Sequence, residues 1–355
     1  MSHSPSERYH DGKAVGVPVM TWMTFFLSAA VIVVAGAKLS QYGDQIAEHT
    51  GLGGLWIGVV LMAAATSLPE VLTDISAALL GTPDLAVGDL FGSNMANMLI
   101  LGIIDLFHRQ KRVWQQATYE HTLTAALAMT LTGLAGLFVV LRLDVALWGV
   151  GADSLIIAVI YVLGMRVVYR QEDVRRRQKE RERIVEAEEE RKTAARSVGL
   201  RRAGIGFAAA TLAIVVAAPS LAASAKEIAK VTGIGATFIG ASLVAVTTSL
   251  PELVTSLAAV RLGAFDLAVG NLYGSNAFNM SVLFFTDVAY RPGPLLRAVS
   301  STHAVTALVG ILLMNIGLMG IIYRAEKRFL LIEPDSFLMI VGYSLGMWVV
   351  FSCGG

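Results

Sequence analysis

The 355-residue chain contains an internal repeat that aligns without a gap after a shift of 182 residues. Thr66–Leu106 and Thr248–Val288 share 22 identities in 41 positions. The chain is therefore expected to build the same substructure twice. Its composition indicates where that substructure lies, because 55% of the residues are hydrophobic and 15% are charged, against about a quarter charged in soluble proteins. These features predict an all-α polytopic membrane protein.

Ten apolar segments make up most of the chain, and most of them are long enough to span a bilayer as a helix. Five fall in each half, and because five is odd, the second half must enter the membrane from the opposite side. The predicted fold is ten transmembrane helices in two inverted five-helix repeats. The first segment is interpreted as a retained span, because it is too long for a signal-peptide core. The segments are Val19–Leu39, Leu52–Leu80, Leu85–Phe107, His121–Leu141, Val145–Tyr169, Ala203–Ala223, Ile234–Leu262, Leu267–Ala289, His303–Tyr323 and Ser336–Phe351.

A charged segment separates the two halves and predicts the orientation of the chain. The expected division is a first transmembrane repeat at 1–169, a linker at 170–202 and a second, inverted repeat at 203–355. The linker holds twelve Lys/Arg and eight Asp/Glu, which is typical of a solvated charged helix, with a regulatory segment as the alternative. Short basic loops stay on the cytoplasmic side. We therefore expect the linker inside the cell, both termini outside, and residence in the cell inner (plasma) membrane.

Two of the apolar segments carry the same polar interruption. Glu70 follows Pro69 in the second segment, and Glu252 follows Pro251 in the seventh. A proline inside a helix leaves a carbonyl without its donor, and a charged side chain at the bilayer centre costs about 2.5–3.5 kcal/mol on insertion scales. Irregular backbone at that depth is tolerated where it faces protein or a wet cavity. Helices 2 and 7 are therefore predicted to be broken, with both glutamates at one cation site between the halves.

A second duplicated block, Gly88–Asn97 and Gly270–Asn279, adds polar side chains at helical spacing. In each copy a serine and an asparagine four residues apart share a helix face, and two glycines four apart allow close approach of another backbone. Each group has a structural alternative, since hydroxyls in spans often bond their own helix and asparagines join helices. The duplicated glutamate on a duplicated proline favours an ion site. The candidate oxygen donors are Thr66, Ser67, Glu70, Ser93, Asn97, Thr248, Ser249, Glu252, Ser275 and Asn279, with freed carbonyls near Ala63–Ala65 and Ala245–Thr247.

The donor set predicts which ions bind. All the candidates are oxygens, which suit hard cations such as Na⁺ and Ca²⁺ rather than zinc or copper. Two carboxylates balance one Ca²⁺ or two Na⁺. Two further acids are not duplicated: Asp74 stands where the second half has Ser256, and Asp89 stands where it has Asn271. Each of these either lines the ion path or pairs with a helix end or a neighbour.

The Thr-Ser-Leu-Pro-Glu and Gly-Asn-x-x-Gly-Ser-Asn-x-x-Asn pairs resemble the α-repeats of the calcium/cation antiporter superfamily, the sodium/calcium exchanger group of microbial type. The resemblance covers nearly the whole chain. It implies alternating access, in which the first and sixth spans slide against a core of the other eight, and no cofactor beyond the transported Ca²⁺ and Na⁺. It implies ion ligands at the carbonyls of Ala63 and Ala245 and at the side chains of Thr66, Ser67, Glu70, Ser93, Asn97, Thr248, Ser249, Glu252, Ser275 and Asn279.

The chain departs from the family pattern at four positions. Ala65 and Thr247 take the place of the usual glycine, and Asp89 replaces the usual asparagine of the first Gly-Asn. Asn279 stands where some relatives, including potassium-dependent ones, carry aspartate, so the chain resembles the potassium-independent branch. The missing negative charge bears on the number of coupling ions.

The predicted function is a secondary antiporter that exchanges Ca²⁺ for Na⁺, not an enzyme. A proton-coupled or other divalent cation antiporter is the nearest alternative. A cation channel would share the oxygen site but conduct without a counter-ion. An intramembrane protease is the weakest alternative, because Gly88-Asp89 has no second catalytic aspartate motif. The expected partners are inorganic cations and the lipid bilayer, with no nucleic acid, and the chain is expected to function as a monomer.

Overall fold

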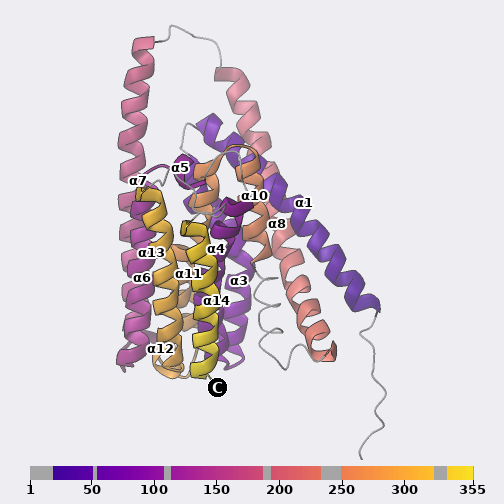
Figure 1. Ribbon diagram of the computed structural model, residues 1–355, viewed down its shortest axis with the longest axis vertical. Helices are drawn as coiled ribbons and strands as arrows, with labels where there is room; N and C mark the ends of the chain where they lie inside the picture. The colour runs from indigo at the N-terminus through magenta and orange to yellow at the C-terminus, as the bar shows by residue number, and fades with distance from the viewer. Residues whose placement is uncertain are drawn as a thin grey trace, which may run out of the picture.

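The computed structural model of the protein describes residues 19–50, 54–107, 113–186, 193–232, 249–323 and 334–354, and these are almost entirely helical (Figure 1). Two short strands pair antiparallel in the one hairpin of the described chain. The elements are α1 (Val19–Thr50), α2 (Gly54–Trp56), the π-helical segment η1 (Ile57–Met62), α3 (Ala63–Leu79), α4 (Pro83–Phe107), α5 (Val113–Gln116), α6 (His121–Leu141), β1 (Ala146–Leu147), β2 (Val150–Gly151), α7 (Ala152–Glu186), α8 (Thr193–Thr232), α10 (Leu250–Arg261), α11 (Phe265–Ala289), α12 (Leu295–Ala298), α13 (Thr302–Tyr323) and α14 (Pro334–Gly354).

Within the described residues, eight helical stretches are long and apolar enough to cross a membrane, which confirms a multi-pass membrane protein. Of the other two predicted segments, the seventh lies mostly at 233–248, outside the described residues. The eighth is α11, whose asparagines, serines and glycines dilute its apolar character. Nineteen of the 25 residues of α11 are buried in protein, so most of its surface needs no apolar exterior. The eight stretches are Val19–Thr50, Ile57–Leu79, Pro83–Leu106, His121–Leu141, Ala152–Gln171, Gly199–Leu221, Thr302–Tyr323 and Asp335–Ser352.

The charged segment 170–202 is helical at both ends. α7 continues through it to Glu186, and α8 begins at Thr193, while residues 187–192 lie outside the described chain. Figure 1 shows both helices projecting beyond the rest of the bundle at one end, with the C terminus at the other. The predicted charged helix is thus confirmed on either side of the gap.

α11 occupies the centre of the bundle and contacts α3, α4, α6, α7, α10 and η1. Its glycines let the η1 backbone approach, as the spacing predicted. A Cβ atom at Gly274 would lie 2.6 Å from Cα of Val59, and one at Gly270 would lie 2.9 Å from the Leu55 carbonyl oxygen. The glycine of η1 is equally close, since a Cβ at Gly58 would lie 2.6 Å from the Leu267 carbonyl oxygen. The two chain halves therefore meet backbone to backbone at this point.

The predicted break at Pro69 is wrong in position. α3 runs without interruption from Ala63 to Leu79, with Pro69 inside it. The irregular backbone lies upstream, in η1, where wider π-helical turns meet α11. A helix can continue through a proline when one carbonyl loses its donor and neighbouring groups compensate. In the second half, Pro251 stands in the first turn of α10, where its missing N–H is not needed.

α1 and α8 lie side by side along one flank of the bundle (Figure 1). Each packs chiefly against the other, and only 22% and 28% of the residues in their membrane-spanning windows are buried. A small apolar cluster joins the pair to α3. It consists of Ala35, Leu39, Ala65, Ala210 and Ile214.

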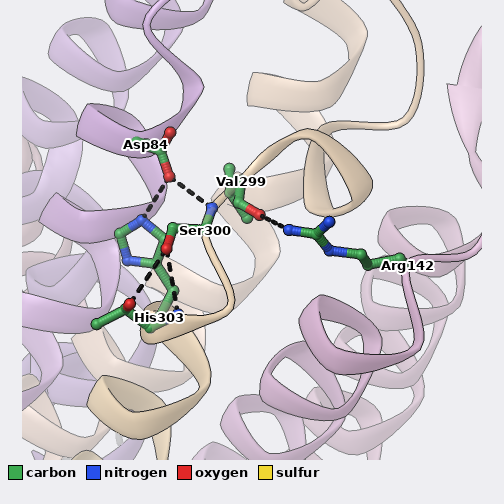
Figure 2. Close-up of polar contacts among 6 residues, drawn as sticks. Asp84, Arg142, Val299, Ser300 and His303 are labelled. Atoms are coloured by element: carbon green, nitrogen blue, oxygen red, sulfur yellow. Dashed lines mark hydrogen bonds and ion pairs between the residues drawn. The ribbon is translucent and has the colours of Figure 1, made fainter. Parts of the chain in front are cut away.

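A carboxylate at the start of α4 anchors the start of α13 (Figure 2). Oδ1 of Asp84 accepts a hydrogen bond from the backbone N–H of Ser300 over 2.7 Å and lies 3.0 Å from Nε2 of His303. Nearby, the guanidinium of Arg142 donates to the Val299 carbonyl over 3.2 Å. These contacts tie α4, α6 and α13 together at the end of the bundle away from the charged linker.

The same anchor recurs with each residue displaced by 182 positions. Oδ1 of Asp266, at the start of α11, accepts a hydrogen bond from the backbone N–H of Thr118 over 2.9 Å and lies 3.1 Å from Nε2 of His121. The sequence repeat is thus also a repeat of contacts.

A second pair of carboxylates, near the other ends of α4 and α11, is duplicated in the same way. Asp287 accepts hydrogen bonds from the Leu295 backbone N–H over 2.8 Å and from the Ser154 hydroxyl. Asp105 occupies the equivalent place in the first half. Its two hydrogen-bond donors lie 182 positions away from the corresponding donors to Asp287. These donors are the Val113 N–H (2.9 Å) and the Ser336 hydroxyl (2.6 Å).

Candidate cation site

The two duplicated glutamates are buried at the contact between α3, α4 and α10. Glu70 is 4% exposed and Glu252 is 0% exposed. The hydroxyl of Ser93 donates to Oε1 of Glu70 over 2.9 Å, and the hydroxyl of Ser67 donates to Oε1 of Glu252 over 3.4 Å. The second oxygen, Oε2, of each glutamate is buried and has no hydrogen-bond partner among the described residues. Each carboxylate is therefore half satisfied by protein.

Two negative charges buried side by side, as at Glu70 and Glu252, are stabilised by a nearby positive charge. Glu70 and Glu252 lie close enough to repel each other. Within the described chain, the contacts of both carboxylates come from hydroxyl groups and, for Glu252, from the backbone, and no basic side chain is among them. Buried charges in proteins are paired or bind metal ions, because an isolated buried charge is very costly. The geometry therefore suits a bound cation.

Two asparagines present carbonyl oxygens in a matching way. The amide of Asn97 donates to Oδ1 of Asn276 over 2.9 Å, and the amide of Asn279 donates to Oδ1 of Asn94 over 3.2 Å. In the described structure, Oδ1 of Asn97 and Oδ1 of Asn279 are buried without a donor. Each predicted ligand thus has its NH₂ group held and its oxygen left available.

Asn94 and Asn276 hold this arrangement at the crossing of α4 and α11. The amide of Asn94 donates to the backbone carbonyl of Asn276 over 3.4 Å, and the amide of Asn276 donates back to the carbonyl of Asn94 over 3.3 Å. Asn94 also donates to the hydroxyl of Thr132 over 3.3 Å. The predicted ligand set omits both residues, although each is the first asparagine of a duplicated Asn-x-x-Asn. That duplication was the signal that could have found them.

The Thr66 hydroxyl bonds its own helix, which is the structural alternative to ion binding. It donates to the carbonyl of Met62 over 3.0 Å and lies 3.3 Å from the carbonyl of Ala63, one turn back on its own helix. It also lies 3.4 Å from Oδ1 of Asn271. Thr66 therefore ties α3 to α11, and it also contacts the carboxylate of Glu252.

The remaining predicted ligands divide into two groups. Ser249 and Ser275 contribute buried hydroxyl oxygens that have no partner in the part of the chain described. Thr248 and the Ala245 carbonyl lie at 233–248, outside the described residues. Among the residues that the structure describes, no three His, Cys, Asp or Glu side chains lie close enough together to hold a metal ion. A cation here would therefore depend on neutral oxygens as well as the two glutamates.

Comparison with known proteins identifies the class of this site. The family described as sodium/calcium exchanger protein matches residues 20–168 and 203–352, which cover both halves and leave out the charged linker. The chain therefore belongs to the sodium/calcium exchanger family, whose members are membrane antiporters of inorganic cations.

Individual relatives agree with this assignment. The chain is 32% identical over 287 residues to the inner membrane protein YrbG of Escherichia coli (strain K12), covering 79% of this chain and 84% of that protein. It is 26% identical over 318 residues to the putative antiporter CaxA of Alkalimonas amylolytica, with coverage of 86% and 94%. The sodium/calcium exchanger MaX1 of Methanosarcina acetivorans is 34% identical over 133 residues, covering 37% of this chain and 38% of that protein.

The fold is similar to that of a solved exchanger. A structure of the sodium-calcium exchanger NCX_Mj superimposes with a TM-score of 0.70 and 20% sequence identity, covering 93% of this chain and 98% of that chain. At that identity the likeness concerns the fold alone. It agrees with the helical, membrane-spanning architecture described above.

Proposed function

We propose that the protein is a secondary active antiporter that exchanges Ca²⁺ for Na⁺ across the membrane by alternating access. One observation carries the proposal: four buried oxygens without a hydrogen-bond donor in the described structure belong to repeat-related ligands. They are Oε2 of Glu70, Oε2 of Glu252, Oδ1 of Asn97 and Oδ1 of Asn279. Acceptor oxygens left without donors are costly in a packed interior, and a hard cation is the partner that satisfies all four.

Charge balance supports exchange at a single site. Glu70 and Glu252 together carry a formal charge of −2, which matches one Ca²⁺ or two Na⁺. Because the same carboxylates bind either ion set, the two sets exclude each other and transport becomes exchange. The proposed ligands are the carbonyls of Ala63 and Ala245 and the side chains of Thr66, Ser67, Glu70, Ser93, Asn97, Thr248, Ser249, Glu252, Ser275 and Asn279.

We propose ten transmembrane helices in two inverted halves, 1–169 and 203–355, joined by a linker at 170–202. The duplicated anchors support this arrangement, because equivalent carboxylates of α4 and α11 make equivalent contacts. α1 and α8 are the proposed moving pair. Their packing supports this, since each contacts the other more than it contacts the rest of the bundle.

The proposed location is the cell inner (plasma) membrane, with the linker in the cytoplasm and both termini outside. The basic excess of 170–202 supports that orientation. The linker ends and the C terminus also lie at opposite ends of the bundle (Figure 1). The proposed working unit is a monomer, because the two halves of one chain supply both duplicated glutamates.

Flux across a reconstituted membrane tests the coupling. Liposomes containing the purified protein are loaded with Na⁺, diluted into Na⁺-free buffer with ⁴⁵Ca²⁺, and compared with liposomes that have no Na⁺ gradient. We expect uptake to require the outward Na⁺ gradient. Uptake that ignores Na⁺ and follows a proton gradient would overturn the Na⁺ assignment. A Ca²⁺ conductance that needs no counter-ion would indicate a channel instead.

A further inference from the structure

A second pair of acids lies outside the proposed ligand set. Asp74 of α3 is 0% exposed, and neither of its carboxylate oxygens has a hydrogen-bond partner in the described chain. The carboxyl group of Asp89, on α4, lies within hydrogen-bonding reach of Asp74. Oδ2 of Asp89 is also buried, with no donor among the described residues. Two carboxylates in contact, with no basic partner in their described surroundings, are stabilised by a bound cation or by a proton shared between them.

The second half shows which side chains can fill the equivalent place between its helices without any charge. There the equivalent residues are Ser256 and Asn271, and the Asn271 amide donates to the Ser256 hydroxyl over 3.0 Å. Both side chains are fully buried. A neutral hydrogen-bonded pair therefore fills the same place between equivalent helices. The two acids of the first half add charge that the packing does not require.

A cavity reaches Asp89 of this pair. Asp89 lines a space of about 200 Å³ together with Ser93, Ser249 and His303. The Ser249 hydroxyl is 3% exposed and has no partner in the described structure, so it supplies a further oxygen. His303 is held at its Nε2 by Asp84 near the end of the bundle (Figure 2). The cavity thus lies between that surface anchor and Ser93 of the main site, and it is large enough for an ion and several waters.

We propose that Asp74 and Asp89 form a second binding site for a hard divalent cation of the Ca²⁺ type. The two carboxylates offer up to four oxygens and a charge that matches Ca²⁺, while Ser249, shared with the transport site, and cavity water complete the shell. The site lies beside the Glu70–Glu252 pair, because both Asp74 and Asp89 interact electrostatically with Glu70. The inference rests on the proposed function, since it adds an entry site in front of the transport site.

Equilibrium binding of ⁴⁵Ca²⁺ to the purified full-length protein tests this site. The variant Asp74→Ser with Asp89→Asn copies the neutral pair of the second half, which equivalent helices already accommodate. We expect it to bind about one Ca²⁺ fewer per chain than the wild type at saturation. Unchanged binding in this variant would overturn the second site, whatever the wild-type total. The milder variant Asp89→Asn, in case the double variant does not fold, should lower the affinity of one Ca²⁺ by about tenfold or more.

A second variant separates this inference from the proposed function. Glu70→Gln with Glu252→Gln removes the charges of the transport site and leaves Asp74 and Asp89 in place. We expect it to retain about one bound Ca²⁺ per chain. Complete loss of binding in this variant, with none lost in the Asp74→Ser and Asp89→Asn double variant, would contradict the second site and leave the transport site intact.

Discussion

Ser67 of α3 donates a hydrogen bond to Glu252 of α10 over 3.4 Å, a contact between residues of different halves. One turn further along α3, Glu70 accepts a hydrogen bond from Ser93 over 2.9 Å. Both carboxylates therefore draw on hydroxyl groups of the first half. This shared environment supports one composite site rather than two independent ones.

Replacement of Ser67 by alanine should weaken Ca²⁺ binding. A hydrogen bond to a charged group contributes about 1.5–3 kcal/mol, so we expect half-saturation of transport to rise by about tenfold or more. The measurement is ⁴⁵Ca²⁺ uptake against Ca²⁺ concentration. Ser76→Ala is the matched control, because its hydroxyl is exposed and bonds the Leu72 carbonyl of its own helix. Equal effects of the two substitutions would contradict the role of Ser67.

Asn94→Ala and Asn276→Ala should lower Ca²⁺ affinity to a similar extent. Each removes the side chain that holds the amide of a ligand, Asn279 or Asn97 respectively. The freed ligand can then rotate, so its carbonyl oxygen is no longer positioned. Thr132→Val should have a smaller effect, because it removes one of several contacts of Asn94. Affinities within experimental error of the wild type for both alanine variants would refute this positioning role.

Gly274→Ala should destabilise the protein. Its Cβ would lie 2.6 Å from both Cα and the carbonyl oxygen of Val59, and backbone atoms cannot yield as a side chain can. We expect a loss of about 1–3 kcal/mol or more, seen as a lower unfolding temperature in detergent. The control is Gly133→Ala, whose nearest neighbour is the Ile311 side chain at 3.6 Å. That control should be near neutral, and a similar loss in both variants would argue against close backbone packing.

Asp287→Ala should cost more stability than a surface acid does. Asp287 accepts hydrogen bonds from two backbone N–H groups and a serine hydroxyl, all buried. Each donor left without a partner costs about 1–3 kcal/mol. Asp144→Ala removes an exposed ion pair with Arg297 and should cost under about 1 kcal/mol. The measurement compares the unfolding temperatures of the two variants. Equal decreases would contradict the predicted difference.

The sequence alone was sufficient to find the glutamates and most of their neighbours. A charged or amide side chain inside an apolar segment is easy to recognise. Its repetition 182 residues later indicates that its position is not a coincidence. The spacing also predicted that Gly270 and Gly274 would admit another backbone, which η1 confirms.

Other features depend on contacts between distant segments and left no local signal. The π-helical turns of Ile57–Met62 follow from packing against α11, whereas proline gave the more visible but misleading cue at Pro69. The roles of Asn94 and Asn276 depend on how α4 crosses α11. An asparagine in a span is equally compatible with helix contacts and with ion binding, so its sequence position could not decide between them.

The most direct test of the account is Na⁺-driven ⁴⁵Ca²⁺ uptake by Glu70→Gln and Glu252→Gln, each measured separately in liposomes. Glutamine keeps the size of the side chain and its ability to accept a hydrogen bond, but it removes the charge. We predict that either substitution reduces uptake to background, while the amount of folded protein matches the wild type. Wild-type uptake in either variant would contradict a transport site built on both carboxylates.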